Sequence, residues 1–470
     1  MLSGPLAAAP GNSILSRPMD DFSRRDLFSR SAATTAAFTL VPRHVLGAGY
    51  TAPSDRLVVA GVGVGGMGKN YLKGVGSENI AVLCDVDDET AAPVWETYPQ
   101  AKHYRDYRRM LDAEKGIDAV VIGTPDHTHT VIAAAAMKLG KHVYCAKPLT
   151  RTIGEARRLA RLARETGVAT QMSVQSCASD KACATAEWVQ SGVIGKIREV
   201  DVWSDRPVWP QGMFRPRQAA TVPATLDWDL WLGPAPQRPY HPAYHPFKFR
   251  GWYDFGTGAL GDMGCHTLHV IVRALSLGPP AAVSATTAGV MRPRRPDEEK
   301  HWSGSKRVEY PETYPHASIV TWRFPARGKH PPVNVTWYDG GLKPPRPVDL
   351  EPGRELGADG ILFRGSKGII LSGFTGGPEL VPARPGYAGP KKKLERAIGH
   401  YEEWVRACKG GPPANCEFGF GTYLTELTLL GNLAVRTGKY LEWNAAEGRV
   451  SNEPDANRFI EEPARPGWEA

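Results

Sequence analysis

The sequence predicts an α/β fold, in which a doubly wound parallel sheet is followed by an α+β domain with an open, mostly antiparallel sheet. Three observations predict this fold class. Apolar strand-like segments alternate with helical segments between residues 56 and 172. A glycine-rich turn follows the first of these strands. After residue 175, apolar residues recur at every second position, as in strands with one solvated face.

Length and composition narrow the class of protein. The chain has 470 residues, of which 42% are hydrophobic and 23% charged, so two globular domains are expected rather than a fibrous or disordered chain. Its longest weakly polar run, residues 31–41, is far shorter than the roughly 20 residues of a membrane-spanning helix. Seven scattered cysteines form no C-x-x-C pair, which argues against a zinc ribbon or a disulfide scaffold. The net charge of +8 is dispersed, so no nucleic-acid partner is expected.

Residues 1–50 have the pattern of a twin-arginine export leader. The stretch SRRDLF at residues 23–28 precedes a short apolar run and then small residues near position 47. We therefore expect the twin-arginine machinery to export the folded protein to the periplasm, with the leader removed or without fixed structure. The long stretch before Met19 suggests that translation starts at that methionine.

The first domain is expected over residues 54–176. Strands are predicted at 56–60, 80–84, 119–122, 142–145 and 168–172. Between the last three of these lie a helix over 128–139, stopped by Gly140, and a helix over 153–166, followed by Gly167. This alternation predicts a parallel sheet with helices on both faces.

The glycine-rich turn has the spacing of a dinucleotide-binding fingerprint, which makes the first domain a Rossmann domain. Two alignments of the fingerprint fit these glycines, one starting at Gly61 and one at Gly63. The alignment on Gly63, Gly65 and Gly68 is preferred because it leaves a full strand before the turn. Glycine is needed there because the backbone must turn tightly and let a pyrophosphate approach its amides. Asp85 follows the second strand, where a carboxylate accepts hydrogen bonds from the ribose hydroxyls and repels a 2′-phosphate, so NAD is favoured over NADP.

The second domain is expected over residues 177–470. Alternating patterns predict strands at 197–203, 281–290, 318–324, 333–338 and 360–371. A C-terminal helix is predicted near 423–436, and the sequence does not indicate which domain it packs against.

A further helix, over 261–275, carries three polar side chains on one stripe. At 100° per residue, Asp262, His266 and His269 share a face, and apolar residues cover the other side. A carboxylate one turn before an imidazole can orient it and raise its basicity. The same pattern also fits a hydrogen-bonded core histidine or an i,i+4 surface pair.

Aromatic residues are dense between positions 203 and 255. Trp252 is the candidate platform for a sugar ring, although core packing explains most of these side chains. His127 and His129 form a His-x-His pair without an acidic third ligand, so no metal site is expected.

Five blocks together resemble the Gfo/Idh/MocA oxidoreductases, specifically their twin-arginine-exported bacterial branch. They are GVGGMG at 63–68, CDVD at 84–87, GTPDHTH at 123–129, GKHVYCAKPL at 140–149 and GDMGCH at 261–266. The resemblance implies an NAD(P)-binding Rossmann domain, a second domain that carries substrate and often oligomer contacts, and hydride transfer on sugars or cyclitols.

The resemblance also implies roles for single residues. Lys147 would hold the substrate hydroxyl and the cofactor, and His266, oriented by Asp262, would act as general base toward that hydroxyl. Two positions depart from the family pattern: Ala146 stands where a glutamate is usual, and Met67 where this branch often has arginine. The first departure removes a carboxylate expected beside the nicotinamide ribose, so we expect the cofactor affinity or the reaction itself to differ from the family pattern.

The remaining implied contacts are with the cofactor and the substrate. Thr124, Pro125 and Asp126 would bind the cofactor, and His129 would lie near its nicotinamide. His269, one turn beyond the general base, would contact the substrate together with Trp252.

Export and cofactor together suggest a tightly held NAD. Free NAD is scarce outside the cytoplasm, so we expect the protein to leave the cell already loaded. The leading hypothesis is a sugar or cyclitol oxidoreductase, and the alternative is an NAD-dependent glycosidase or lyase that oxidises its sugar transiently. A non-catalytic sugar- or cofactor-binding protein is a third hypothesis, suggested by Ala146.

Overall fold

The computed structural model describes residues 55–374 and 376–470. The predicted export leader, residues 1–50, and the suggested start at Met19 lie outside the described residues. From Arg56 onward the chain forms one compact unit, to which the following description refers.

The first half contains the predicted parallel sheet. Its six strands lie in the order β3-β2-β1-β4-β5-β6, so the direction of winding reverses between β1 and β4. In open α/β sheets, ligands bind beyond the carboxyl ends of the strands at this reversal. The strands are β1 (Val58–Val62), β2 (Asn79–Cys84), β3 (Lys102–Tyr104), β4 (Ala119–Ile122), β5 (His142–Cys145) and β6 (Thr170–Met172).

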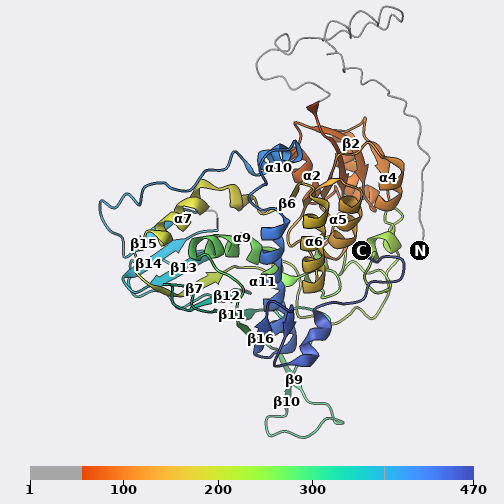
Figure 1. Ribbon diagram of the computed structural model, residues 1–470. Coiled ribbons are helices and arrows are strands. Elements are labelled where there is room, and N and C mark those ends of the chain that lie inside the picture. Colours follow the sequence, from red (N-terminus) through yellow and green to blue (C-terminus); the bar gives the residue numbers. More distant parts are fainter. Residues whose placement is uncertain (1–54, 375) are drawn as a thin grey trace, which may run out of the picture. The chain divides into compact units, whose positions relative to one another are not determined.

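Helices lie on both faces of this sheet (Figure 1). Helix α6 begins and ends where the sequence predicts, because Thr152 and Glu155 form a reciprocal capping box and Gly167 closes the helix at φ 65°. The pattern missed β3, α3 and α4, which are short and rich in polar residues. The helices are α2 (Gly68–Gly74), α3 (Asp88–Thr97), α4 (Tyr107–Ala113), α5 (His129–Lys138) and α6 (Ile153–Thr166).

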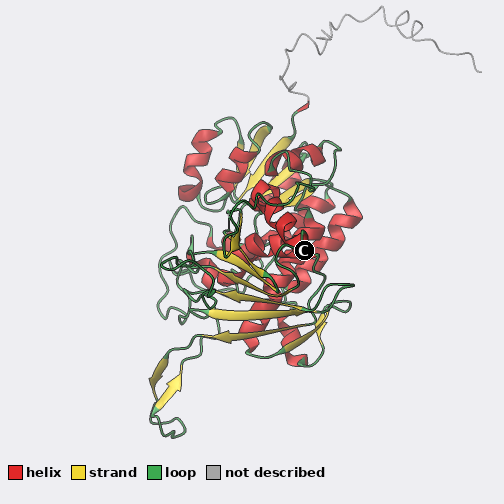
Figure 2. Cartoon of the chain, turned by 90° about the vertical axis from the view of Figure 1, so that its left-hand side faces the viewer, coloured by secondary structure: helices red, strands yellow, loops and turns green. Residues whose placement is uncertain are grey.

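The second half is built on a nine-stranded sheet in the order β15-β14-β13-β7-β12-β11-β8-β16-β17. Only β7 and β12 pair in parallel, so the sheet is mixed and mostly antiparallel, as expected. Strands β9 (Met291–Pro293) and β10 (Ser305–Arg307) form a separate hairpin that projects from it (Figure 2). The nine strands are β7 (Ile197–Trp203), β8 (Ala282–Thr287), β11 (Ser318–Phe324), β12 (Val333–Tyr338), β13 (Gly360–Gly365), β14 (Gly368–Ser372), β15 (Pro378–Val381), β16 (Leu441–Asn444) and β17 (Arg449–Val450).

One predicted strand is wrong. Residues 360–371 form two antiparallel strands, β13 and β14, joined by a tight turn at Ser366 and Lys367. Gly368 follows that turn at φ 143°, a conformation that favours glycine, and it lets the chain reverse between two apolar segments.

The C-terminal helix packs against both halves. Helix α11 contacts α6 of the first half and α9, β8 and β11 of the second. Small residues permit this close approach: a Cβ at Gly431 would lie 2.5 Å from Leu260 and 2.8 Å from Trp322. The second-half helices are α7 (Asp180–Gln190), α8 (Trp228–Leu232), α9 (Gly258–Leu275), α10 (His400–Cys408) and α11 (Phe418–Thr437). No helix in the described part of the chain is long and apolar enough to span a membrane.

Candidate active site

A cleft of about 1120 Å³ runs along the carboxyl ends of the parallel strands. One wall comes from the loops after β1, β2, β4 and β5, and the other from residues 206–250 and the start of α9. The cleft brings together most of the residues that the sequence singles out: Gly63, Gly65, Asp85, Thr124, Pro125, Asp126, Lys147, Asp262 and His266.

The glycine turn fits a dinucleotide. Strand β1 ends at Val62, and Gly63 follows at φ 73°, where a Cβ would lie 2.5 Å from the Thr124 side chain. A Cβ at Gly68 would overlap the carbonyl oxygen of Gly63, so neither position accepts a side chain. At Gly66 a Cβ would meet nothing within 4 Å, which leaves the turn open toward the cleft.

Two polar side chains beside this turn support the same assignment. The Asp85 carboxylate accepts hydrogen bonds from the amides of Val64 and Gly65, at 2.8 and 3.1 Å, and so fixes the turn from the end of β2. Burial raises the pKa of Asp85, although these amide contacts oppose the rise. The hydroxyl of Thr124 is buried and has no hydrogen-bond partner in the described structure. Such a group in a cleft wall is suited to bind a polar ligand.

Lys147 and Asp262 form the charged centre of the site. Lys147 follows β5, and its Nζ donates to Asp262 Oδ1 at 2.7 Å and to the Asp262 carbonyl oxygen at 2.5 Å. Arg250 Nε also faces Asp262 Oδ1, at 3.4 Å. Burial opposes ionisation of this carboxyl, but the two cations lower the pKa of Asp262 to about 2. Asp262 is therefore a carboxylate at neutral pH that holds both cations in place.

His266 lies in the cleft without a hydrogen bond to Asp262. Its Nδ1 is buried and unpartnered within the described chain, and its ring packs edge-on against Phe374 at a centroid distance of 5.2 Å. Burial and the nearby charge of Lys147 hold the pKa of His266 well below its ordinary value. The structure thus shows no hydrogen bond through which Asp262 would orient this ring, and Oδ1 of the carboxylate faces the two cations instead.

Besides Gly68, three predicted site residues lie outside the cleft wall. His129 is fully buried, and its Nδ1 and Nε2 lie 2.9 and 2.8 Å from the carbonyl oxygens of Pro148 and Thr124. It ties together the chain segments after β4 and β5 instead of lining the cleft. His269 is also fully buried, and neither ring nitrogen has a partner in the described part of the chain.

Trp252, the third predicted site residue outside the cleft wall, lies in the hydrophobic core. It is fully buried among aromatic side chains, and its Nε1 donates to the carbonyl oxygen of Ala243 at 2.9 Å. It is therefore not available as a sugar platform. Trp209 lines the cleft instead, with the guanidinium of Arg250 5.7 Å from its ring centroid.

Sequence reasoning also missed Arg250. It lies in the short 3-10 helix Lys248–Gly251, where no periodic pattern marks it. Its proximity to Asp262 results from tertiary packing. Its position only twelve residues before Asp262 was the one available signal.

The histidine pair does not form a metal site. His127 is buried, with Nδ1 3.2 Å from the Phe255 carbonyl oxygen and Nε2 3.0 Å from that of Trp231. Burial lowers the pKa of His127 to about 3. Within residues 55–374 and 376–470, no group of three or more His, Cys, Asp or Glu side chains could hold a metal ion.

Comparisons with known proteins agree with this geometry. Residues 57–174 match a family model described as oxidoreductase family, NAD-binding Rossmann fold, and residues 193–285 match the C-terminal α/β domain of the same family. A levoglucosan dehydrogenase from Pseudarthrobacter phenanthrenivorans is 25% identical over 187 residues, which is 40% of each chain. The chain thus matches less than half the length of that relative.

Solved structures share the fold over most of the chain. The WlbA dehydrogenase of Bordetella pertussis, in complex with NADH and UDP-GlcNAcA, superposes with a TM-score of 0.57 at 18% identity, covering 83% of this chain and 99% of its own. The aldose-aldose oxidoreductase of Caulobacter crescentus superposes with a TM-score of 0.54 at 16% identity, covering 83% and 100%. With two consecutive domain matches spanning residues 57–285, the chain belongs to the Gfo/Idh/MocA oxidoreductase family, and its first domain is an NAD-binding Rossmann domain.

Proposed function

We propose that this protein is an NAD-dependent oxidoreductase that acts on a hydroxyl group of a sugar or cyclitol and keeps its nicotinamide cofactor tightly bound. One observation carries the proposal: the glycine turn, Lys147 and His266 line a single cleft at the point where the sheet reverses its winding. The name of the levoglucosan dehydrogenase relative supports the class of substrate.

Different residues of the cleft would bind the cofactor, bind the reacting hydroxyl and accept its proton. The turn at Gly63, together with Asp85 and Thr124, would hold the cofactor, which supplies hydride transfer when bound. Lys147, fixed by Asp262, would donate a hydrogen bond to the reacting hydroxyl and favour its deprotonation. His266 has an unprotonated ring at neutral pH and would accept the proton of that hydroxyl.

A screen of sugars and cyclitols against the purified protein tests this proposal. We expect one class of substrate to raise the absorbance of reduced nicotinamide without added cofactor. The Lys147→Ala variant should show no such change, and Lys196→Ala, an exposed lysine outside the cleft, should behave as the wild type. Absence of any reduction by sugars, cyclitols or their glycosides, despite bound NAD, would favour the non-catalytic hypothesis.

Retention of the cofactor is measured separately. Denaturing the purified protein should release NAD(H) in a ratio of about one per chain. A bound cofactor must be regenerated in place, and the name of the structural neighbour from Caulobacter crescentus supports regeneration by a second aldose. Glycoside cleavage without added cofactor would instead favour the NAD-dependent glycosidase or lyase.

We also propose that the twin-arginine machinery exports the protein to the periplasm, and that it assembles as a homo-oligomer. The arginine pair at positions 24 and 25 supports the first proposal. Replacing both arginines by lysine should keep the protein in the cytoplasmic fraction, and an unchanged periplasmic fraction would contradict the export route. Light scattering of the purified protein measures its oligomeric state, and a monomer would contradict the second proposal.

A further inference from the structure

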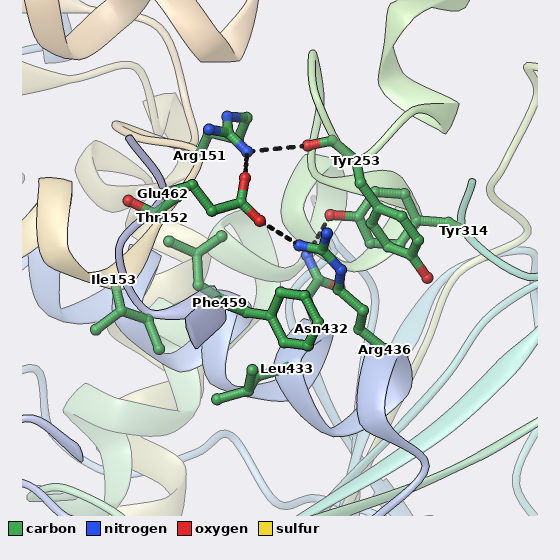
Figure 3. Close-up of a pocket in the computed structure, with 11 residues that line it drawn as sticks. Arg151, Thr152, Ile153, Tyr253, Tyr314, Asn432, Leu433, Arg436, Phe459 and Glu462 are labelled. Carbon is green, nitrogen blue, oxygen red and sulfur yellow. Dashed lines mark hydrogen bonds and ion pairs between the residues drawn. The ribbon is translucent and has the colours of Figure 1, made fainter. Parts of the chain in front are cut away.

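The C-terminal segment, residues 460–470, is anchored at two places before it reaches the cleft, and we call it the C-terminal strap. At the first anchor, Glu462 lies between two arginines (Figure 3). One carboxylate oxygen pairs with Arg151, and the other accepts from Arg436 Nη1 at 2.5 Å. Burial opposes ionisation of Glu462, but the two guanidinium groups lower its pKa. This anchor fixes the start of the strap where α6 meets α11.

The second anchor is Arg465. Its backbone amide donates to the Pro234 carbonyl oxygen at 2.9 Å, and its Nε donates to the Gly233 carbonyl oxygen at 2.9 Å. Its Nη1 reaches the carboxylate of Asp229 and the side chain of Gln237, both at 2.5 Å. Arg465 thus binds the strap to α8 and to the segment that follows it, and Leu230 and Trp231 of α8 line the cleft.

Beyond these anchors, Trp468 lies in the cleft wall. Its side chain is 8% exposed, and the guanidinium of Arg108 lies 4.1 Å from its ring centroid. Tyr107, at the start of α4, has its ring centroid 6.4 Å away. Tyr107 and Trp468 both line the cleft. Figure 1 shows the C-terminus beside the first half of the molecule, away from β16, which belongs to the large sheet.

The strand order of the parallel sheet indicates which end of a bound cofactor would lie near Trp468. Helix α4 follows β3, which is an edge strand of the parallel sheet. Strand β3 lies on the same side of the winding reversal as β2, the strand that ends before Asp85. A dinucleotide lies across the reversal with its adenosine on this side and its nicotinamide toward β5 and Lys147. Trp468 therefore lines the adenosine end of the cleft.

The second half of the chain closes over this same end. The amide of Asp227 donates to the Val86 carbonyl oxygen at 2.8 Å, and the amide of Asp88 donates to the Thr225 carbonyl oxygen at 3.1 Å. Arg105 Nη2 also donates to the Thr225 carbonyl oxygen, at 3.1 Å. These bonds join the loops after β2 and β3 to the segment before α8, whereas the strap is anchored to α8 itself and to the segment after it.

We infer that the strap and the segment 223–237 form a clamp on the adenosine end of the cofactor, and that Trp468 is a cofactor-retention residue. This inference rests on the proposed function, because it presumes that the cleft binds NAD. An indole held rigid by Arg108 offers an apolar surface to the adenine at little entropic cost. The anchors at Glu462 and Arg465 keep that surface in place, so the clamp slows dissociation without touching the reacting end.

The rate of NADH dissociation from the full-length protein tests the clamp. Variants Trp468→Ala, Trp468→Phe and a chain ending at Glu462 are loaded with NADH and mixed with excess NAD, and the loss of bound-NADH fluorescence is followed. Trp302→Ala is the matched control, because Trp302 is 93% exposed on the projecting hairpin, outside the cleft. We expect dissociation to accelerate about tenfold or more for Trp468→Ala and for the shortened chain. Trp468→Phe should restore part of the slow rate, which a loss of folding alone would not produce.

Two results separate the clamp from the proposed function. If the wild type holds NAD and reduces it with a sugar, but Trp468→Ala and the shortened chain release NADH within about twofold of the wild-type rate, the clamp is refuted and the proposed function stands. If the wild type binds neither NAD nor NADH, both fail. Equal acceleration by Trp302→Ala would also refute the specific role of Trp468.

Discussion

At the scale of single residues, the site depends on how one carboxylate is shared. Asp262 pairs with Lys147 at 2.7 Å and faces Arg250 at 3.4 Å, and all three groups are largely shielded from water. In such an environment, opposite charges stabilise each other more strongly than they do at the surface, provided that both stay paired. The carboxylate therefore fixes Lys147, and His266 is left with a free ring nitrogen for the substrate.

The Asp262→Asn variant should lose stability in a pH-dependent way. The folded-state pKa of about 2 lies below the ordinary value of 3.8, so ionised Asp262 stabilises the fold above the ordinary value, and this contribution disappears as the pH falls toward 2. Relative to the wild type, we expect a loss of about 2 kcal/mol at pH 7 that shrinks toward zero near pH 2, measured by urea unfolding. Asp112→Asn, at an 89% exposed side chain, should cost less than about 0.5 kcal/mol. A pH-independent loss for Asp262→Asn would contradict this view.

The lowered pKa of His266 predicts the pH dependence of turnover. A general base must be unprotonated, and a pKa well below 6.5 keeps the imidazole neutral at mildly acidic pH. We expect kcat/KM for sugar oxidation to stay level from about pH 8 down to about pH 6, and His266→Ala to lower it by about 10² or more. His301→Ala, at an exposed histidine, is the control and should leave the profile unchanged. An acidic limb centred near 6.5 in the wild type would argue against His266 as the base.

At the scale of elements, the glycine turn and its neighbouring strand ends determine where a cofactor can lie. The turn leaves β1 with φ 73° at Gly63 and is held by the carboxylate after β2. The loop after β4 packs directly behind it, because Gly63 touches Thr124. A side chain in the turn would therefore displace two strand ends at once.

Gly63→Ala should weaken cofactor binding. The new Cβ would lie 2.5 Å from Thr124 and would require a left-handed backbone, so the turn must move away from the cleft. We expect the affinity for NADH to fall by at least about tenfold, as measured by isothermal titration calorimetry of cofactor-free protein. Gly116→Ala, where a Cβ meets nothing within 4 Å, should bind NADH as the wild type does. Normal NADH affinity in Gly63→Ala would place the cofactor elsewhere.

At the scale of the whole molecule, the two halves share one structural core. Helix α11 packs on α6, α9 and the large sheet, and a single buried apolar cluster contains residues of both halves. The cleft lies between these halves, so its width depends on their contact. We expect them to unfold together, because neither half retains this core without α11.

Leu430→Ala tests this coupling. Leu430 is fully buried in α11, and its truncation should cost about 2–5 kcal/mol. Tryptophan fluorescence and the release of bound NADH should report one transition, shifted equally to lower temperature. Leu139→Ala, at a 49% exposed position, is the matched control with an expected change of less than about 0.5 kcal/mol. Two separate transitions in the wild type would show that the halves are independent.

The sequence by itself determined the alternation of strands and helices in the first half and the position of the glycine turn, because these are local patterns of spacing and period. It misread 360–371 as one strand, since alternation continues across a tight turn. Tertiary structure alone decided that Asp262 binds Lys147 and Arg250 instead of His266, and that Trp252 is buried whereas Trp209 and Trp468 line the cleft. The physical reason is that the partners of a charge or a ring are supplied by elements distant in sequence, and periodicity carries no information about which of them come close.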